Sequence, residues 1–113
     1  MLPRHANELL RELENVVNVG CAVVNRNLLL HWYAQQRLTV SIWRDIQEKW
    51  QEVLDQAVSV QNKDVPLLAG EGDGVITFIY GEGLTTAKGA WLKDVKDWAR
   101  PSGLAFMNKS KAS

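Results

Sequence analysis

The feature that most constrains this chain is a glycine-rich turn followed by an apolar run. The turn Gly70-Glu71-Gly72-Asp73-Gly74 has three glycines in five residues, which permits positive φ angles at little steric cost. Val75 to Tyr80 then follows as a run of β-branched and aromatic side chains, which is typical of a strand. Pro66 limits the preceding 65–68 to an edge strand or an extended approach. We expect these two segments to form a β-hairpin.

A helix is predicted over about 40–57. Thr39 or Ser41 can cap its N-terminus. Its apolar side chains recur at helical spacing and share one face, which consists of Trp43, Ile46, Trp50, Val53, Leu54 and Ala57.

Residues 5–35 allow two interpretations. Apolar residues recur every three or four positions from Leu10 to Trp32, and this spacing favours a helix over about 5–35, bent near Gly20. The alternative is a β-hairpin across 16–34, because valines are frequent there and Asn25-Arg26-Asn27 is a plausible turn. We prefer the helix, because its polar stripe is continuous.

A third helix is expected after Thr85 or Thr86. Its apolar side contains Ala87, Trp91, Leu92, Val95 and Trp98, and Pro101 and Gly103 end it. Residues 104–107 are expected to add a last strand. The predicted class is therefore α+β, with two or three helices packed on a small antiparallel sheet of 65–68, 75–80 and 104–107. The length of 113 residues indicates one globular domain over 1–113, with a frayed tail from about 108.

Charge and cysteine content limit the expected partners and the expected cellular compartment. Thirteen basic and thirteen acidic side chains give zero net charge, which argues against a general binder of nucleic acid and does not oppose self-association. Polar residues interrupt the apolar segment 16–34, so no membrane partner is expected. Cys21 is the only cysteine, which fits a reducing compartment and predicts a cytoplasmic protein. Among neighbouring valines, Cys21 is interpreted as a small buried hydrophobic residue.

The chain contains five tryptophans. A tryptophan-rich core is the first interpretation, because a buried tryptophan covers a large apolar area. The alternative is an aromatic pocket or an exposed contact patch. The candidate residues for either are His31, Trp32, Trp43, Trp50, Trp91 and Trp98.

Chemical signatures are few. A glycine-rich passage before a helix can bind phosphate through backbone N–H groups, which makes a weak anion site conceivable at Gly81, Gly83, Thr85, Thr86 and Lys88. The third glycine of a dinucleotide fingerprint and the Gly-Lys-Ser/Thr of a P-loop are missing. No catalytic residue, metal site or cofactor is predicted.

Three functions follow in order of preference. The first is a non-enzymatic protein-interaction module that forms a homodimer or binds a protein partner. The second is a small-molecule-binding domain, or a minor enzyme, with an aromatic pocket near His31, Trp32 and Trp43. The third is a weak nucleic-acid binder that uses the basic residues of 88–111, which Asp94 and Asp97 dilute.

Overall fold

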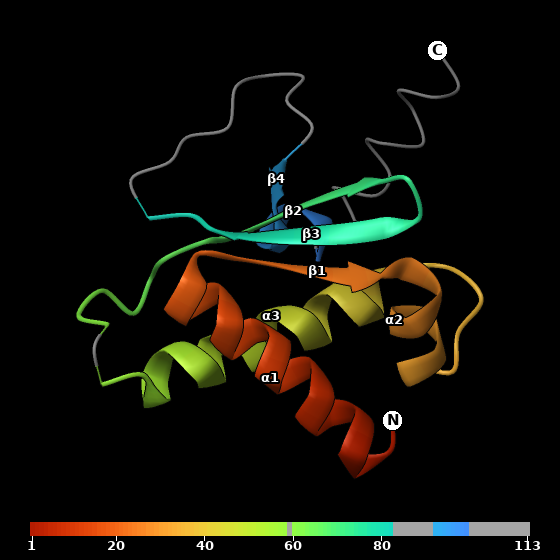
Figure 1. Cartoon of the computed structure of the whole chain (residues 1–113), viewed down its shortest axis with the longest axis horizontal. Coiled ribbons are helices and arrows are strands. Elements are labelled where there is room, and N and C mark those ends of the chain that lie inside the picture. The colour runs from red at the N-terminus through yellow and green to blue at the C-terminus, as the bar shows by residue number, and fades with distance from the viewer. Residues whose placement is uncertain (59, 83–91, 100–113) are drawn as a thin grey trace.

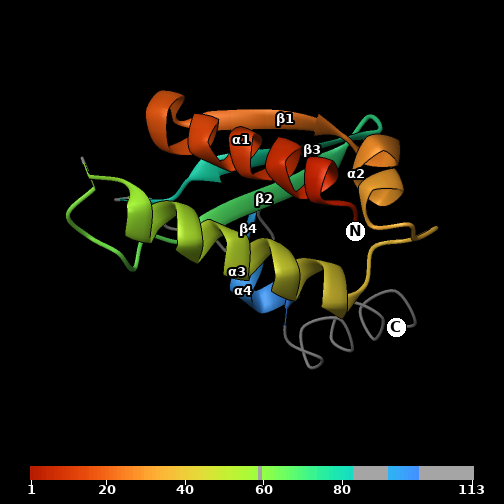
Figure 2. The ribbon, with the colours of Figure 1, turned by 90° about the horizontal axis from the view of Figure 1, so that it is seen from below.

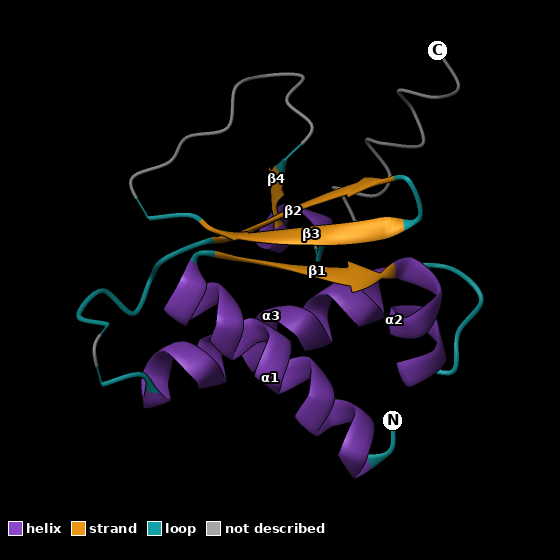
Figure 3. Cartoon of the chain, viewed as in Figure 1, coloured by secondary structure: helices purple, strands orange, loops and turns teal. Residues whose placement is uncertain are grey.

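The computed structural model describes residues 1–58, 60–82 and 92–99. In chain order its elements are α1 (Pro3–Val19), β1 (Cys21–Asn25), α2 (Arg26–Trp32), α3 (Val40–Gln56), β2 (Leu67–Gly72), β3 (Val75–Tyr80), β4 (Lys93–Asp94) and α4 (Val95–Trp98). The strands form one antiparallel sheet in the order β1-β3-β2-β4. Helices α1, α2 and α3 all lie on one side of this sheet (Figures 1 and 3). The α+β class is confirmed.

The hairpin of β2 and β3 forms where the glycine-rich turn predicted it. Gly72 pairs with Val75, and the two residues between them, Asp73 and Gly74, have φ angles of 55° and 77°. Positive φ at both positions is the backbone of a type I′ turn, whose twist matches that of paired strands. Strand β2 begins one residue after Pro66 rather than at 65, because proline has no N–H to donate to a strand partner.

Each interpretation of 5–35 is correct only in part: residues 5–19 are helical as preferred, but this helix does not continue to 35, and no hairpin spans 16–34. Helix α1 ends at Gly20, which has a left-handed φ of 105° and donates its N–H to the Val16 carbonyl. Residues 21–25 then form β1, which pairs with β3. Residues 28–32 belong to α2, whose first turn is capped by Asn25 through a 3.1 Å bond from the Leu28 N–H to Oδ1. Pairing with a strand 50 to 58 residues away in sequence therefore overrides the local helical spacing.

The third strand of the sheet also differs from expectation. β1 lies beside β3, whereas the proposed strand 104–107 is outside the described residues, as is the tail from 108. The predicted third helix is wrong at 93–94, which pair with β2 as β4. Only the short α4 follows, and Asp94 caps it by accepting the Lys96 N–H at 2.9 Å.

Helix α3 confirms the prediction over 40–56, and Thr39 Oγ1 accepts the Ile42 N–H at 3.4 Å. The core lies between the helices and the sheet. Its fully enclosed side chains, each 0% exposed, include Leu9, Leu13 and Val16 of α1, Ile46 and Trp50 of α3, and Ile76 and Phe78 of β3.

Trp50 ties α3 to the chain entering β2. Its indole Nε1 donates to the Val65 carbonyl at 2.8 Å, and its ring meets Tyr80 edge-on with centroids 6.1 Å apart. The bond satisfies a carbonyl that would otherwise be buried without a donor, which is costly in an apolar interior.

Replacing Trp50 with phenylalanine is expected to lower the free energy of unfolding by about 2–4 kcal/mol, through lost packing and an unsatisfied Val65 carbonyl. Urea unfolding followed by circular dichroism measures the loss. The matched control is Trp32→Phe, at a tryptophan that is 3% exposed and whose indole has no described hydrogen bond. Equal losses in the two variants would show that the Trp50 bond contributes nothing.

Candidate functional site

The described tryptophans lie mainly in the core. Trp32, Trp43 and Trp50 are 3%, 4% and 0% exposed. Trp98 is partly exposed and stacks on Trp43, with ring centroids 5.6 Å apart and planes 28° apart. Trp91 lies outside the described residues. Because Trp43 and Trp50 are enclosed, neither presents its ring as a surface contact.

A shallow apolar hollow does form beside His31 and Trp32. It measures about 540 Å³ and lies where the start of α1 meets the end of α2. His5 and His31 meet there with ring centroids 5.3 Å apart. Trp43 does not line it, so the structure brings together two of the three residues predicted for an aromatic pocket.

The paired histidines do not make a metal site by themselves. A zinc site needs three or four protein ligands. Within the described ranges, no group of three or more histidine, cysteine, aspartate or glutamate side chains is placed to hold a metal ion.

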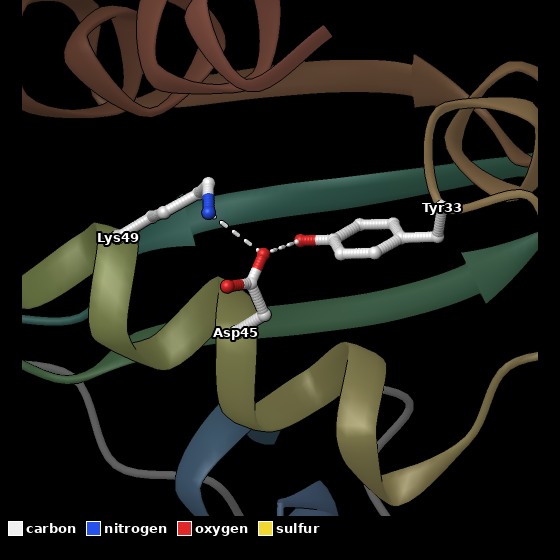
Figure 4. Close-up of polar contacts among 3 residues, drawn as sticks. All are labelled: Tyr33, Asp45 and Lys49. Atoms are coloured by element: carbon white, nitrogen blue, oxygen red, sulfur yellow. Dashed lines mark hydrogen bonds and ion pairs between the residues drawn. The ribbon is translucent and has the colours of Figure 1, made fainter. Parts of the chain in front are cut away.

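Figure 4 shows a polar cluster of Tyr33, Asp45 and Lys49. These three residues are among those that line a second hollow of about 380 Å³. The Tyr33 hydroxyl donates to Asp45 Oδ2 at 2.6 Å, and the Lys49 ammonium donates to the same oxygen at 2.8 Å. Burial, followed by the bond to Asp45 and its negative charge, raises the pKa of Tyr33 well above the ordinary value of 10.0. The Tyr33 hydroxyl is therefore a hydrogen-bond donor and not a base. Its bond to Asp45 links the end of α2 to α3.

Gly81 is the described member of the proposed anion site. Its N–H donates to the Pro66 carbonyl at 2.9 Å, and a Cβ at this position would come within 2.5 Å of that same oxygen. The glycine is thus required for a close approach of two backbones, and its N–H is already engaged. Gly83, Thr85, Thr86 and Lys88 lie outside the described residues.

The open edge of the sheet is a feature that the sequence analysis missed. β1 pairs with β3 on one side, and no described strand pairs with its other side (Figure 2). Tyr80 donates its N–H to the Gly20 carbonyl at 3.0 Å, and Arg26 donates to Gly74 at 2.9 Å. Because antiparallel pairing alternates, the backbone N–H groups of Cys21, Val23 and Asn25 face the open edge.

The side chains of these three residues are exposed as well. Burial along β1 alternates, with Ala22 and Val24 buried under the helices and Cys21, Val23 and Asn25 exposed on the other face. The expectation that Cys21 is buried was therefore wrong, because the strand period turns it away from the helices. The only sequence signal for β1 was the β-branched pair after Gly20, and it lacked the polar–apolar alternation that marks a half-buried strand.

Apolar side chains surround this edge. Val19, Val23 and Leu28 are 75%, 57% and 43% exposed. A groove of about 290 Å³ runs beside the strand and is lined by Glu8, Arg11, Glu12, Val23, Val24, Asn25, Leu28 and Trp32. Proteins commonly protect edge strands with lysine, proline or a bulge. The β1 sequence, Cys-Ala-Val-Val-Asn, contains neither lysine nor proline.

Removing the Tyr33 hydroxyl is expected to change how stability depends on pH. The pKa of Tyr33 is raised in the folded state, so its contribution is present below pH 10.0 and is lost as the pH rises above that value. At neutral pH, Tyr33→Phe is expected to cost about 0.5–2 kcal/mol. Above the ordinary tyrosine pKa, wild type loses up to about 1.4 kcal/mol per pH unit that the variant does not lose.

Urea unfolding of both proteins, from neutral to alkaline pH, tests this expectation. Tyr80 is present in both, so its titration cancels in the comparison. Parallel stability curves for the two proteins would contradict the role assigned to Tyr33.

Comparison with protein-family models, with curated protein sequences and with solved structures found no match for this chain. No helix in the described part of the chain has the length and apolar character needed to cross a membrane. Among the residues that the structure describes, the open edge of β1 and the hollow beside His31 are features on which a function can be argued.

Proposed function

We propose that this protein is a non-enzymatic interaction module that pairs with a protein strand at the open edge of β1, and that it self-associates there. The observation that carries this proposal is the set of exposed residues Cys21, Val23 and Asn25, whose N–H groups face the edge. An extended segment added to a sheet edge gains main-chain hydrogen bonds, and its side chains fill neighbouring surface.

The surroundings of the edge favour association. Each main-chain bond contributes about 0.5–1.5 kcal/mol net. Covering Val19, Val23 and Leu28 adds hydrophobic stabilisation of about 25 cal/mol per Å² of apolar surface removed from water. Both contributions are needed, because association costs several kcal/mol of lost translational and rotational freedom.

Charge and thiol chemistry are compatible with this function. Zero net charge means that two copies do not repel each other at long range. Cys21 is exposed and not in a disulfide, and an exposed thiol persists in a reducing compartment, which supports the cytoplasmic location that we propose.

The second candidate is a small-molecule-binding domain at the hollow beside His31. Its support is the pair of imidazoles, His5 and His31, next to an apolar wall that includes Leu30 and Trp32. Binding pockets are usually concave and enclose most of a ligand. This hollow is open, and we therefore rank small-molecule binding below pairing at the edge.

Nucleic-acid binding has less support. The described lysines of the segment proposed for it, Lys93 and Lys96, alternate with Asp94 and Asp97, so these residues form no basic patch.

A charge on the open edge is expected to weaken self-association. Lysine at an edge is one of the devices that prevents strand addition, so Val23→Lys should raise the dissociation constant at least about tenfold, equal to about 1.4 kcal/mol. Sedimentation equilibrium over a range of protein concentrations measures this constant. Wild type should show a mass that rises with concentration.

The matched control is Val58→Lys, the same change at a valine that is 99% exposed and outside the strands. It should associate as wild type does. Circular dichroism and tryptophan fluorescence verify that both variants fold. A wild type that stays monomeric at all concentrations, or an equal effect of the two substitutions, would refute the proposal.

A further inference from the structure

We infer that the strand added to β1 is the β1 strand of a second copy of this chain, antiparallel and centred on Val23. This inference rests on the proposed function and specifies its partner and geometry. It predicts a two-fold symmetric dimer in which the Val23 residues of the two copies face each other.

The spacing of the outward-facing residues supports this register. Cys21, Val23 and Asn25 direct their N–H groups to the edge and are symmetric about Val23. In a two-fold antiparallel pair centred there, Val23 faces Val23, and Cys21 faces Asn25 of the other copy. All three outward-facing residues of each strand then have a strand residue opposite them.

Neighbouring registers use the edge less completely. A pair centred on Ala22 would place Asn25 opposite Val19, which belongs to α1. A pair centred on Val24 would place Cys21 opposite Asn27, which belongs to α2. The backbone at Val19 and Asn27 is helical and not extended, so it cannot continue an antiparallel ladder, and each of these registers leaves part of the edge unpaired.

The directions in which the β1 side chains project are also compatible with a dimer centred on Val23. Residues directly opposite in an antiparallel pair project to the same face of the sheet. The Val23 side chains of the two copies would therefore touch on the face away from the helices, and the two α1 helices would approach on the other face. There Arg11 lies beside Glu8 and Glu12 in the groove along β1, so each copy brings both signs of charge to the contact.

The same geometry limits the assembly to two copies. A two-fold contact uses the same edge on both molecules and is closed. The other described edge strand, β4, has only the two residues Lys93 and Asp94, both charged. A short charged edge is a poor template for further strand addition.

Disulfide trapping tests the register. In the variant Val23→Cys with Cys21→Ser, the new cysteines would face each other at a Cα separation of about 5.5 Å, within the range that a disulfide can span. Mild oxidation should convert most of the chain to a covalent dimer on a non-reducing gel. In wild type, Cys21 and its counterpart would be offset by four residues, or about 14 Å, and should not cross-link.

Two further variants distinguish pairing in this register from random collision of the chains. Asn25→Cys, with Cys21 retained, should also cross-link, because residues 21 and 25 face each other in this register. Val58→Cys with Cys21→Ser is the control for random collision, and after oxidation it should run as the single chain on the non-reducing gel. Sedimentation of the reduced variants confirms that the substitutions leave association intact.

Two failures can be told apart. If wild type dimerises but Val23→Cys with Cys21→Ser does not cross-link, the register is wrong and the proposed interaction stands. Cross-linking by Val23→Cys only when Cys21 is retained would indicate pairing centred on Ala22. If no protein associates at any concentration, the proposed function and this inference fail together.

Discussion

The pairing of β1 with β3 is the contact on which the rest of the structure depends. It joins residues 21–25 to residues 75–79 and so connects the N-terminal helices to the hairpin. A two-stranded hairpin alone is marginal in water, whereas a third strand and a helical layer make a stable sheet. With β1 in place, Ala22, Val24, Ile76 and Phe78 form a continuous inner face against which α1 and α3 pack.

This pairing also determines where a functional surface can lie. The helices cover one face of the sheet, and most of the tryptophan area is used there: Trp50 bonds to the chain before β2, and Trp43 stacks on Trp98. Because those rings pack in the core, stability explains the tryptophans of the described residues. Within the described part of the chain, backbone groups without a strand partner lie at the outer edge of β1.

Features encoded by short sequence segments were predictable, and those that depend on distant partners were not. The turn at 73–74, the strand 75–80 and the helix after Thr39 each follow from local chemistry. The preferred helix over 5–35 missed β1, because Cys21 and Val23 on its outer face are as apolar as Ala22 and Val24 on its inner face, so its period-two pattern is hidden. The Tyr33–Asp45 bond and the open edge could not be read from sequence, because each depends on how separate elements are placed.

The register of β1 illustrates how such a strand can nevertheless be specific. A slip by one residue would exchange Val24 for Val23 and Ala22 for Cys21 on the inner face, and hydrophobicity alone would barely oppose it. The two ends of the strand supply the missing constraint. Gly20, in a left-handed conformation, ends α1, and Asn25 caps α2, so β1 has no freedom to slide. The same two caps therefore decide that Val23, and not Val24, stands at the centre of the exposed edge.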